Sequence, residues 1–300
     1  MDENRFTEDF SQLSSSGRKP LPSKTGAYLL AILKSRLYWG ILLFAIIPIL
    51  LETLGINIVF GMLVYFSLFW FFVFRPLVKT SQPGRSLIAD IVAYVFTAVI
   101  GTMFALFVEN FWVSNGAAPF LQSNSPPIAI PSYIVFVGTT EEFSKQIIIL
   151  LAIAFVRIRR IHVKPVEFMI MGISSGLGFS AIENISYVQK GIMNEVVHHT
   201  VGTGVVTALS RALYTPFLHA IFAGIASYGL GLAASRGGKT WWGALGMWLI
   251  AACFHGFYDA TIDTHVGWAL IAVALCYFLF LALLLSGMRS HNFTKLGNPW

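Results

Sequence analysis

The stretch Ser132–Val156 reads SYIVFVGTTEEFSKQIIILLAIAFV, and it decides the fold class of this chain. It is long enough to cross a bilayer, because about 20 predominantly apolar residues span the hydrocarbon core as a helix. Yet it carries Glu141, Glu142 and Lys145 near its middle. Each such charge costs at least about 2.5–3.5 kcal/mol at the centre of a transmembrane helix. Three charges so close together therefore require partners, water or a function.

Helical spacing predicts how these three charges pair. Lys145 follows Glu141 by four residues, the spacing at which side chains on one helix face make contact. Glu142 lies about 100° further around the helix, since an α-helix has 3.6 residues per turn. We therefore expect Lys145 to pair with Glu141 and to serve Glu142 less well.

The composition of the whole chain places this stretch in a membrane protein. Of its 300 residues, 56% are hydrophobic and 11% are charged, whereas a soluble domain has about 25% charged residues. The net charge of +6 comes from basic residues in loops, which indicates orientation in a membrane and argues against a nucleic-acid partner. Cys253 and Cys276 both lie in apolar stretches, so neither a disulfide framework nor a CxxC metal pair is indicated. We expect an all-α, polytopic helical bundle in a lipid bilayer.

Hydropathy predicts eight transmembrane helices, with boundaries accurate to a few residues. The expected spans are Leu37–Leu51, Ile56–Phe74, Leu87–Val108, Ser132–Val156, Val166–Val188, Gly202–Ala234, Trp241–Ile262 and Val266–Ser286. Pro216 lies inside the sixth span, and we expect it to kink that helix and to free a backbone carbonyl.

The distribution of Lys and Arg predicts the orientation of these spans. Of the 20 basic residues, 17 fall in loops and tails on one side of the predicted membrane, which favours cytoplasmic N and C termini. The segment Glu109–Pro131 contains no Lys or Arg and is then an extracytoplasmic loop. The expected domains are a flexible cytoplasmic tail (1–35), a transmembrane domain (36–288) and a second cytoplasmic tail (289–300).

Polar residues also occur inside the fifth, sixth and seventh spans, and each has an ordinary structural interpretation. Glu183 could lie at the membrane interface, above a small-residue stripe that packs against another helix. Arg211 could be a counter-ion for a buried carboxylate, and His219 a hydrogen-bonded core histidine. His255 and Asp259 are four residues apart and could form a structural pair, in which the carboxylate fixes the tautomer of the ring.

These structural interpretations weaken when the predicted depths are compared. Glu141, Glu183 and His255 lie roughly 7–15 Å below the outer ends of their spans at 1.5 Å per residue, and His219 fits the same layer if the long sixth span projects outward. Carboxylates and imidazoles from four helices could then share one pocket in the outer half of the membrane. Such a set of groups can activate water.

Four motifs in this order resemble the PrsW family of intramembrane proteases, which are relatives of the CAAX prenyl endopeptidases and bacteriocin-processing proteases. The family pattern is EExxK, FxxxE, a His after a Pro, and HxxxD. The matching segments here are EEFSK (Glu141–Lys145), GLGFSAIEN (Gly176–Asn184), RALYTPFLH (Arg211–His219) and HGFYD (His255–Asp259). The motifs cover residues 141–259, and the first 80 residues and the last span carry none of them.

The resemblance implies a peptidase in a bacterial cytoplasmic membrane that cuts a membrane-bound protein near the outer face. In the family this role includes the first cleavage of an anti-sigma factor in stress signalling. Carried over by motif, the expected catalytic residues are Glu141, Glu142, His219 and His255, with Glu183 and Asp259 as supporters or additional ligands. The residues expected to support them are Lys145, Arg211 and Asn184.

The mechanism stays open at this point. Either Glu141 or Glu142 could act as the general base on water, with Asp259 orienting His255. His219 and His255, with Glu183, could bind zinc, or the two histidines could stabilise an oxyanion without a metal. No HExxH motif is present to decide between these mechanisms.

Two other classes of function also fit parts of the pattern. Intramembrane Glu, Lys, Arg and His mark proton pathways, so a proton- or ion-coupled transporter is one alternative. The polar residues cluster in spans four to seven, however, and the sequence has no two-halves symmetry of the kind many transporters show. A non-catalytic scaffold or immunity protein on a protease fold is another alternative.

Overall fold

The computed structural model describes residues 67–77, 83–198, 211 and 214–293, and every regular element in these ranges is helical. The predicted all-α architecture is thus confirmed for the described part of the chain. The span Leu37–Leu51, most of Ile56–Phe74 and the tail 1–35 lie outside the described residues. The tail predicted at 289–300 begins as helix, because the last helix continues to Phe293.

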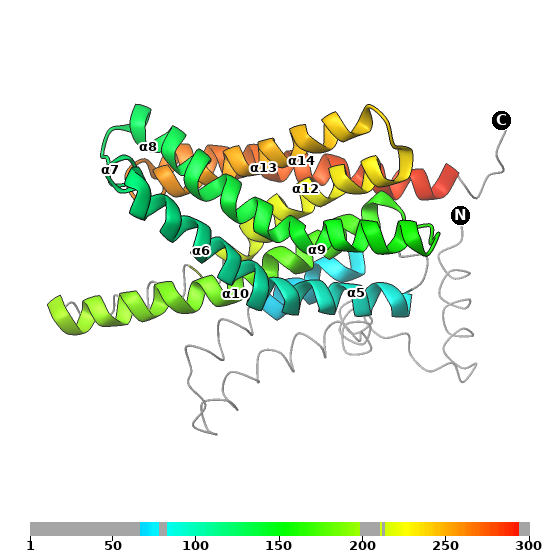
Figure 1. Ribbon diagram of the computed structural model, residues 1–300, viewed down its shortest axis with the longest axis horizontal. Coiled ribbons are helices and arrows are strands. Elements are labelled where there is room, and N and C mark those ends of the chain that lie inside the picture. The colour runs from blue at the N-terminus through cyan, green and yellow to red at the C-terminus, as the bar shows by residue number, and fades with distance from the viewer. Residues whose placement is uncertain (1–66, 78–82, 199–210, 212–213, 294–300) are drawn as a thin grey trace, which may run out of the picture. The chain divides into compact units, whose positions relative to one another are not determined.

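The described chain begins with helical residues 67–74 and then follows the order shown in Figure 1. The first elements are η1 (Arg75–Leu77), α5 (Pro83–Phe96), the π-helix η2 (Thr97–Gly101), α6 (Thr102–Trp112), the π-helix η3 (Val113–Ala117) and α7 (Ala118–Leu121). The remaining elements are α8 (Pro126–Tyr133), the π-helix η4 (Ile134–Gly138), α9 (Thr139–Ile158), α10 (Pro165–His198), α12 (Thr215–Arg236), α13 (Thr240–Thr261) and α14 (Val266–Phe293).

Four helical segments of the described chain are long and apolar enough to cross a membrane. They are Ser86–Leu121, Pro165–His198, Thr215–Arg236 and Val266–Gly287. These segments overlap four of the predicted spans, whereas the total of eight spans and the cytoplasmic location of both termini stay predictions. The charged stretch Ser132–Val156 is also helical throughout, running from the end of α8 through η4 into α9.

Two local expectations concern Glu109–Pro131 and Pro216. The segment Glu109–Pro131 is mostly helical, with a break at Asn115 and Gly116 and a non-helical stretch between Leu121 and Pro126, and its extracytoplasmic location stays a prediction. Pro216 lies in the first turn of α12, which begins at Thr215, and the kink expected inside a longer span stays a prediction, because most of residues 199–213 lie outside the described part of the chain. A proline is tolerated there, since the first N–H groups of a helix have no intrahelical partner.

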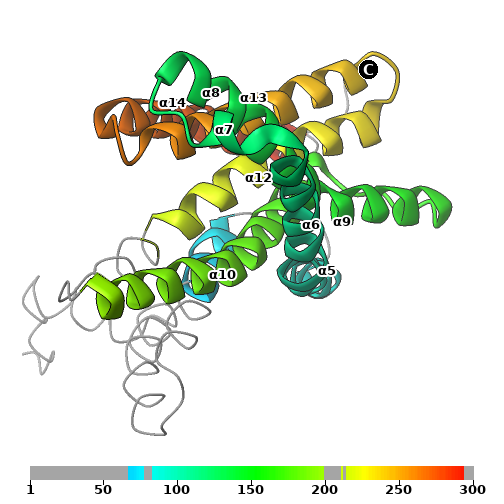
Figure 2. The ribbon, with the colours of Figure 1, turned by 60° about the vertical axis from the view of Figure 1, so that its left-hand side comes forward.

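The centre of the described bundle is the contact between α10 and α12, which cross in Figure 2. This contact depends on residues without bulky side chains. A Cβ on Gly172 would lie 2.0 Å from Ser227 Oγ, and a Cβ on Gly176 would lie 2.2 Å from the His219 carbonyl oxygen. Helices in membranes associate through such close backbone approaches. The small-residue stripe predicted on the fifth span is therefore a packing face that brings α10 against the backbone of His219.

A second close contact brings α9 to α13, through the π-helix η4. A Cβ on Gly138 would lie 2.3 Å from the Ala252 carbonyl oxygen, and a Cβ on Gly256 would lie 2.4 Å from Ile134 Cα. Gly138 directly precedes α9, and Gly256 follows His255. The packing of these small residues therefore places the start of α9, where the glutamate doublet lies, beside His255.

Buried polar contacts connect the helices around this centre. Ser227 on α12 donates to Gln146 Oε1 on α9 at 2.6 Å, and Ser175 on α10 donates to the Lys145 carbonyl oxygen at 2.7 Å. Thr97 in η2 contacts Ser175 Oγ at 2.7 Å. The side chains that make these hydrogen bonds are neutral and buried, and Lys145 takes part through its backbone carbonyl. The hydrogen bonds therefore fix how α9, α10 and α12 are aligned without burying further charges.

Candidate active site

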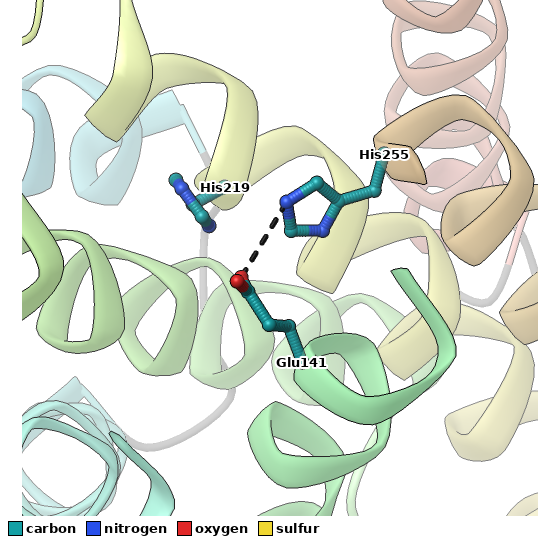
Figure 3. A group of neighbouring side chains, drawn as sticks. All are labelled: Glu141, His219 and His255. Carbon is teal, nitrogen blue, oxygen red and sulfur yellow. Dashed lines mark ion pairs between the residues drawn. The ribbon is translucent and has the colours of Figure 1, made fainter. Parts of the chain in front are cut away.

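Helices α9, α12 and α13 bring one carboxylate and two imidazoles to a single point. Figure 3 shows Glu141, His219 and His255 directed toward one another from these three helices. All three are buried, with at most 6% of their surface exposed. The planes of the two imidazoles are nearly perpendicular, and their ring centroids are 5.0 Å apart. The predicted convergence of the glutamate doublet with both histidines is thus found in the structure.

Lys145 on α9 forms the expected ion pair with Glu141, but its shorter contact is with Glu142, which helical spacing had ranked second. Lys145 Nζ lies 2.7 Å from Glu142 Oε1 and 3.4 Å from Glu141 Oε2. Side chains three residues apart on a helix are neighbours, as are those four residues apart, so Glu142 is also within reach of Lys145. Glu142 is therefore the carboxylate held by the lysine, and Glu141 is the less restrained one.

His255 is held between the two glutamates. Its Nδ1 lies 2.8 Å from Glu142 Oε1, whereas its Nε2 lies 3.4 Å from Glu141 Oε2 and 3.3 Å from Asp259 Oδ2. Because Glu142 is ion-paired with Lys145 it can only accept, so Nδ1 donates the hydrogen bond. In the neutral form of this tautomer Nε2 carries the lone pair, and this nitrogen faces both Glu141 and Asp259. The expected pairing of His255 with Asp259 is present, but the shorter contact of the ring is with Glu142.

His219 is in contact with a second carboxylate, from α10. Its Nε2 lies 2.9 Å from Glu183 Oε2, and its Nδ1 is buried without a hydrogen-bond partner. The other oxygen of Glu183 accepts a hydrogen bond from Arg211 Nη2 at 2.8 Å. Glu183 is thus shared by an imidazole and a guanidinium, rather than lying alone at an interface.

Arg211 and Asn184 fix the position of Glu183. Arg211 Nε donates to Asn184 Oδ1 at 2.8 Å, and Asn184 Nδ2 donates to the Arg211 carbonyl oxygen at 3.1 Å. The guanidinium also lies 3.3 Å from the centre of the Tyr187 ring. With Nε, Nη2 and one face of the guanidinium in contact, the geometry agrees with Arg211 as a counter-ion for a buried carboxylate.

Aromatic rings enclose the two imidazoles. The Phe222 ring is stacked on His255 at 5.3 Å, and the Phe179 ring lies 5.6 Å from His219. Lys145 Nζ also lies 4.3 Å from the centre of the Phe179 ring. These rings lower the polarity around the ion pairs, which strengthens the electrostatic interactions among them. The sequence motif indicated Phe179, whereas Phe222 was not foreseen, because an apolar residue in an apolar span carries no signal.

One atom from each of Glu141, His219 and His255 lies within 4.8 Å of the others, close enough for a metal ion to be shared. Two imidazoles and a carboxylate are a donor set used for catalytic zinc, with the fourth position left to water. The unpartnered Nδ1 of His219 and the lone pair of His255 Nε2 are consistent with this use. The residues present therefore fit a divalent metal such as zinc.

Glu109 on α6 is a site residue that the sequence analysis missed. It lies half-buried within electrostatic range of Glu183, His255 and Asp259, and its buried Oε1 has no hydrogen-bond partner. Hydropathy places Glu109 at the first position of a loop, whereas in the structure it lies inside α6. A carboxylate at the end of an apolar span, with no Lys or Arg nearby to pair with it, is a signal that could have identified it.

Comparison with known proteins agrees with this geometry. The family model described as PrsW family intramembrane metalloprotease matches residues 85–285. This range includes every residue of the buried cluster from Glu109 to Asp259. Searches of the curated proteins and of the solved structures find no match to this chain.

Proposed function

Because the chain belongs to the PrsW family of intramembrane metalloproteases, we propose that it hydrolyses a peptide bond of a membrane protein near the extracytoplasmic face, with water activated beside Glu141. Family membership makes the chain a protease whose substrate is a membrane protein. The observation that carries the assignment of the reacting groups is the convergence of Glu141, His219 and His255.

We propose that His219 and His255 hold a zinc ion beside Glu141. A zinc ion bound there would supply Lewis acidity toward water and toward the scissile carbonyl. From the motif we expected Glu183 as a third ligand. Glu183 is not available for that role, because it already contacts Arg211 and His219 through its two oxygens, and Glu141 is kept free as the base on water. Glu183 then orients His219, as carboxylates behind metal-binding imidazoles do.

The two glutamates of the doublet have different tasks in this mechanism. Glu142 accepts from both Lys145 and His255, and so it fixes the tautomer and the direction of the His255 ring. Glu141 has only the two longer contacts of 3.4 Å, which leave it free to meet water. Glu141 takes a proton from the attacking water and delivers it to the nitrogen of the scissile bond. The water oxygen ends in the new carboxyl group, and the amine leaves neutral.

A comparison of two variants tests this division of labour. In nanodiscs, Glu141→Gln should lose cleavage of a single-pass substrate by at least about 100-fold while the thermal unfolding temperature stays within a few degrees of the wild type. Glu142→Gln should also lose cleavage, but with a clearly lower unfolding temperature, because Lys145 and His255 both lose an anionic partner. Wild-type cleavage by Glu141→Gln would overturn the assignment.

The substrate can be sought in cells. Newly formed protein termini in membranes of wild-type and Glu141→Gln cells should differ for the natural substrate. We propose a membrane-bound anti-sigma factor in a bacterial cytoplasmic membrane as the first candidate, since the resemblance to the family points to it. A stress-dependent sigma-factor reporter that responds equally in both strains would remove that candidate without affecting the protease assignment. Ion flux in proteoliposomes without cleavage would support a transporter instead.

A further inference from the structure

We propose that Glu109 determines substrate specificity: together with Asp259, it selects substrates that carry a positively charged side chain beside the scissile bond. This inference rests on the proposed function, since it concerns the substrate of that same site. It assigns a role to a carboxylate that lies outside the four sequence motifs.

Glu109 lies on the inner face of α6. The buried residues Thr102 and Ala105 precede it at helical spacing, so the three residues form one stripe along that face. This face packs against α9, α10 and η4, and the Trp112 ring lies 5.5 Å from the Phe136 ring of η4. The packing places Glu109 on the face of α6 that is turned toward α9 and α10, within electrostatic range of Glu183 and Asp259.

Glu109 differs from the three glutamates of the sequence motifs because no Lys or Arg in the described chain forms an ion pair with it. Glu142 is paired with Lys145, and Glu183 is paired with Arg211. One oxygen of Glu109 is buried without a hydrogen-bond partner, and the carboxylate is repelled by Glu183 and Asp259 and attracted by His255 and Lys145. A buried carboxylate without a partner is costly, so such a group indicates a missing partner.

The charges around the site indicate which partner is missing. Five carboxylates face the cluster, contributed by Glu109, Glu141, Glu142, Glu183 and Asp259. The two permanent cations that contact this cluster in the described chain are Lys145 and Arg211. With all five carboxylates ionised and both histidines neutral, as metal ligands are, three negative charges remain, and a divalent ion would balance two of them. A cationic group on the substrate would balance the third.

Exposure shows from which side the substrate would bring that charge. The side chains of Glu141 and Glu142 are at most 7% exposed, whereas the side chain of Asp259 is 28% exposed. Glu109 is half-buried and so is also partly exposed. Glu183 is 17% exposed, but Arg211 already neutralises it. Glu109 and Asp259 are therefore the uncompensated carboxylates next to which an incoming substrate would lie.

The proposal is tested with quenched fluorescent peptides derived from a substrate that the wild type cleaves. Three peptides differ at one position adjacent to the cleaved bond, which holds Lys, Gln or Glu. The wild type in nanodiscs should cleave the Lys peptide at least about 10-fold faster (kcat/KM) than the Gln peptide, and the Glu peptide most slowly. Equal rates for the three peptides at each flanking position would overturn the proposal without the need for a variant.

Variants then assign the preference to Glu109. Glu109→Gln should bring the Lys and Gln peptides to within about 2-fold of each other without slowing the Gln peptide, and Glu109→Lys should favour the Glu peptide. Asp263→Asn removes an exposed charge near the end of α13 and should keep the wild-type preference. A Glu109→Gln variant that retains the full Lys preference, or that slows all peptides equally, would contradict the proposal.

A binding measurement separates this inference from the proposed function. Glu141→Gln protein should bind the Lys peptide at least about 10-fold more tightly than the Gln peptide in fluorescence anisotropy. Absence of cleavage by the wild type would refute the protease mechanism, whereas cleavage without a charge preference would refute the role of Glu109 alone.

Discussion

The helices at the centre of the described bundle differ from those at its edge in a way that reverses the pattern of a soluble protein. Within the 18-residue apolar stretch of each helix, 83% of the residues of α10 and of α12 are buried, compared with 28% for Ser86–Leu121 and for α14. The central pair is nevertheless the less apolar of the two groups. In a bilayer the surroundings are as apolar as any core, so polar residues and small residues move inward and large apolar residues face lipid.

The same comparison locates the chemistry. Glu183 and His219 lie on the central pair, and α9 and α13 add the other residues of the candidate site against it. On the outer segments, exposed residues such as Phe107 and Phe278 face outward. The polar exception on α6 that reaches the cluster is Glu109. If function and stability depend on the residues packed around α10 and α12, changes there should have larger effects than matched changes on the outer helices.

The largest expected effect concerns the metal. Dialysis against a strong chelator should remove at least about 99% of the cleavage activity, because the zinc ion that we propose would supply the Lewis acidity at the centre of the site. Added zinc should restore that activity in the wild type and should not restore it in His219→Ala. Elemental analysis of the purified protein should find about one zinc per chain in the wild type and far less in the variant. Full activity in metal-free protein would indicate the glutamate mechanism without a metal.

Removal of the buried lysine should give the next largest effect. Lys145→Met leaves two buried carboxylates without their cation, and breaking such a buried pair costs about 3–5 kcal/mol. We expect this loss in the free energy of unfolding, measured by steric trapping in bilayers. Arg157→Met removes a cation from the exposed last turn of the same helix and should change stability by less than about 1 kcal/mol. Similar losses in both variants would contradict the importance of the central charges.

The sequence was sufficient to predict the convergence of the polar residues, but not their pairing. Four helices, each with an unusual polar residue at a similar depth, had to satisfy those residues together. The choice of Glu142 by Lys145 depends on the position of His255, which contacts the same oxygen from another helix. Spacing along one helix contains no information about a neighbour contributed by a distant segment.

The sequence also could not show where the helices start and stop around the loop Glu109–Pro131 or near Pro216. The predicted loop contains proline and glycine and lacks basic residues, a pattern typical of an extracytoplasmic loop. Helical residues instead continue up to Asn115 and Gly116, whose non-helical backbone angles interrupt η3, and resume in α7. The hydropathy of the sixth span gave no sign that α12 starts at Thr215, so Pro216 could not be assigned to a first turn.

Two phenylalanines on α14 allow the inner and outer environments to be compared on one helix. Phe280 is 1% exposed and lies in the main core cluster, whereas Phe278 is 66% exposed. Phe280→Ala should cost about 3–5 kcal/mol in the free energy of unfolding, as buried aromatic truncations do. Phe278→Ala should cost less than about 1 kcal/mol in the same assay, because its ring makes few contacts within the protein. Equal costs would mean that α14 is buried against a further surface.

The smallest expected change in stability comes with a change in activity that tests the central contact most directly. Gly176→Ala places a Cβ 2.2 Å from the carbonyl oxygen of His219, so α10 and α12 must separate. Overpacking of this kind costs about 1–3 kcal/mol, and here it also moves His219 relative to Glu183. We expect cleavage to fall by at least about 10-fold, measured on the same nanodisc preparation as the unfolding.

Gly243→Ala on α13 is the matched control, because a Cβ there meets no atom within 4 Å. That variant should gain up to about 1 kcal/mol of helix stability and keep its activity. If Gly176→Ala loses stability but cleaves normally, the contact between α10 and α12 supports the fold without setting the position of His219.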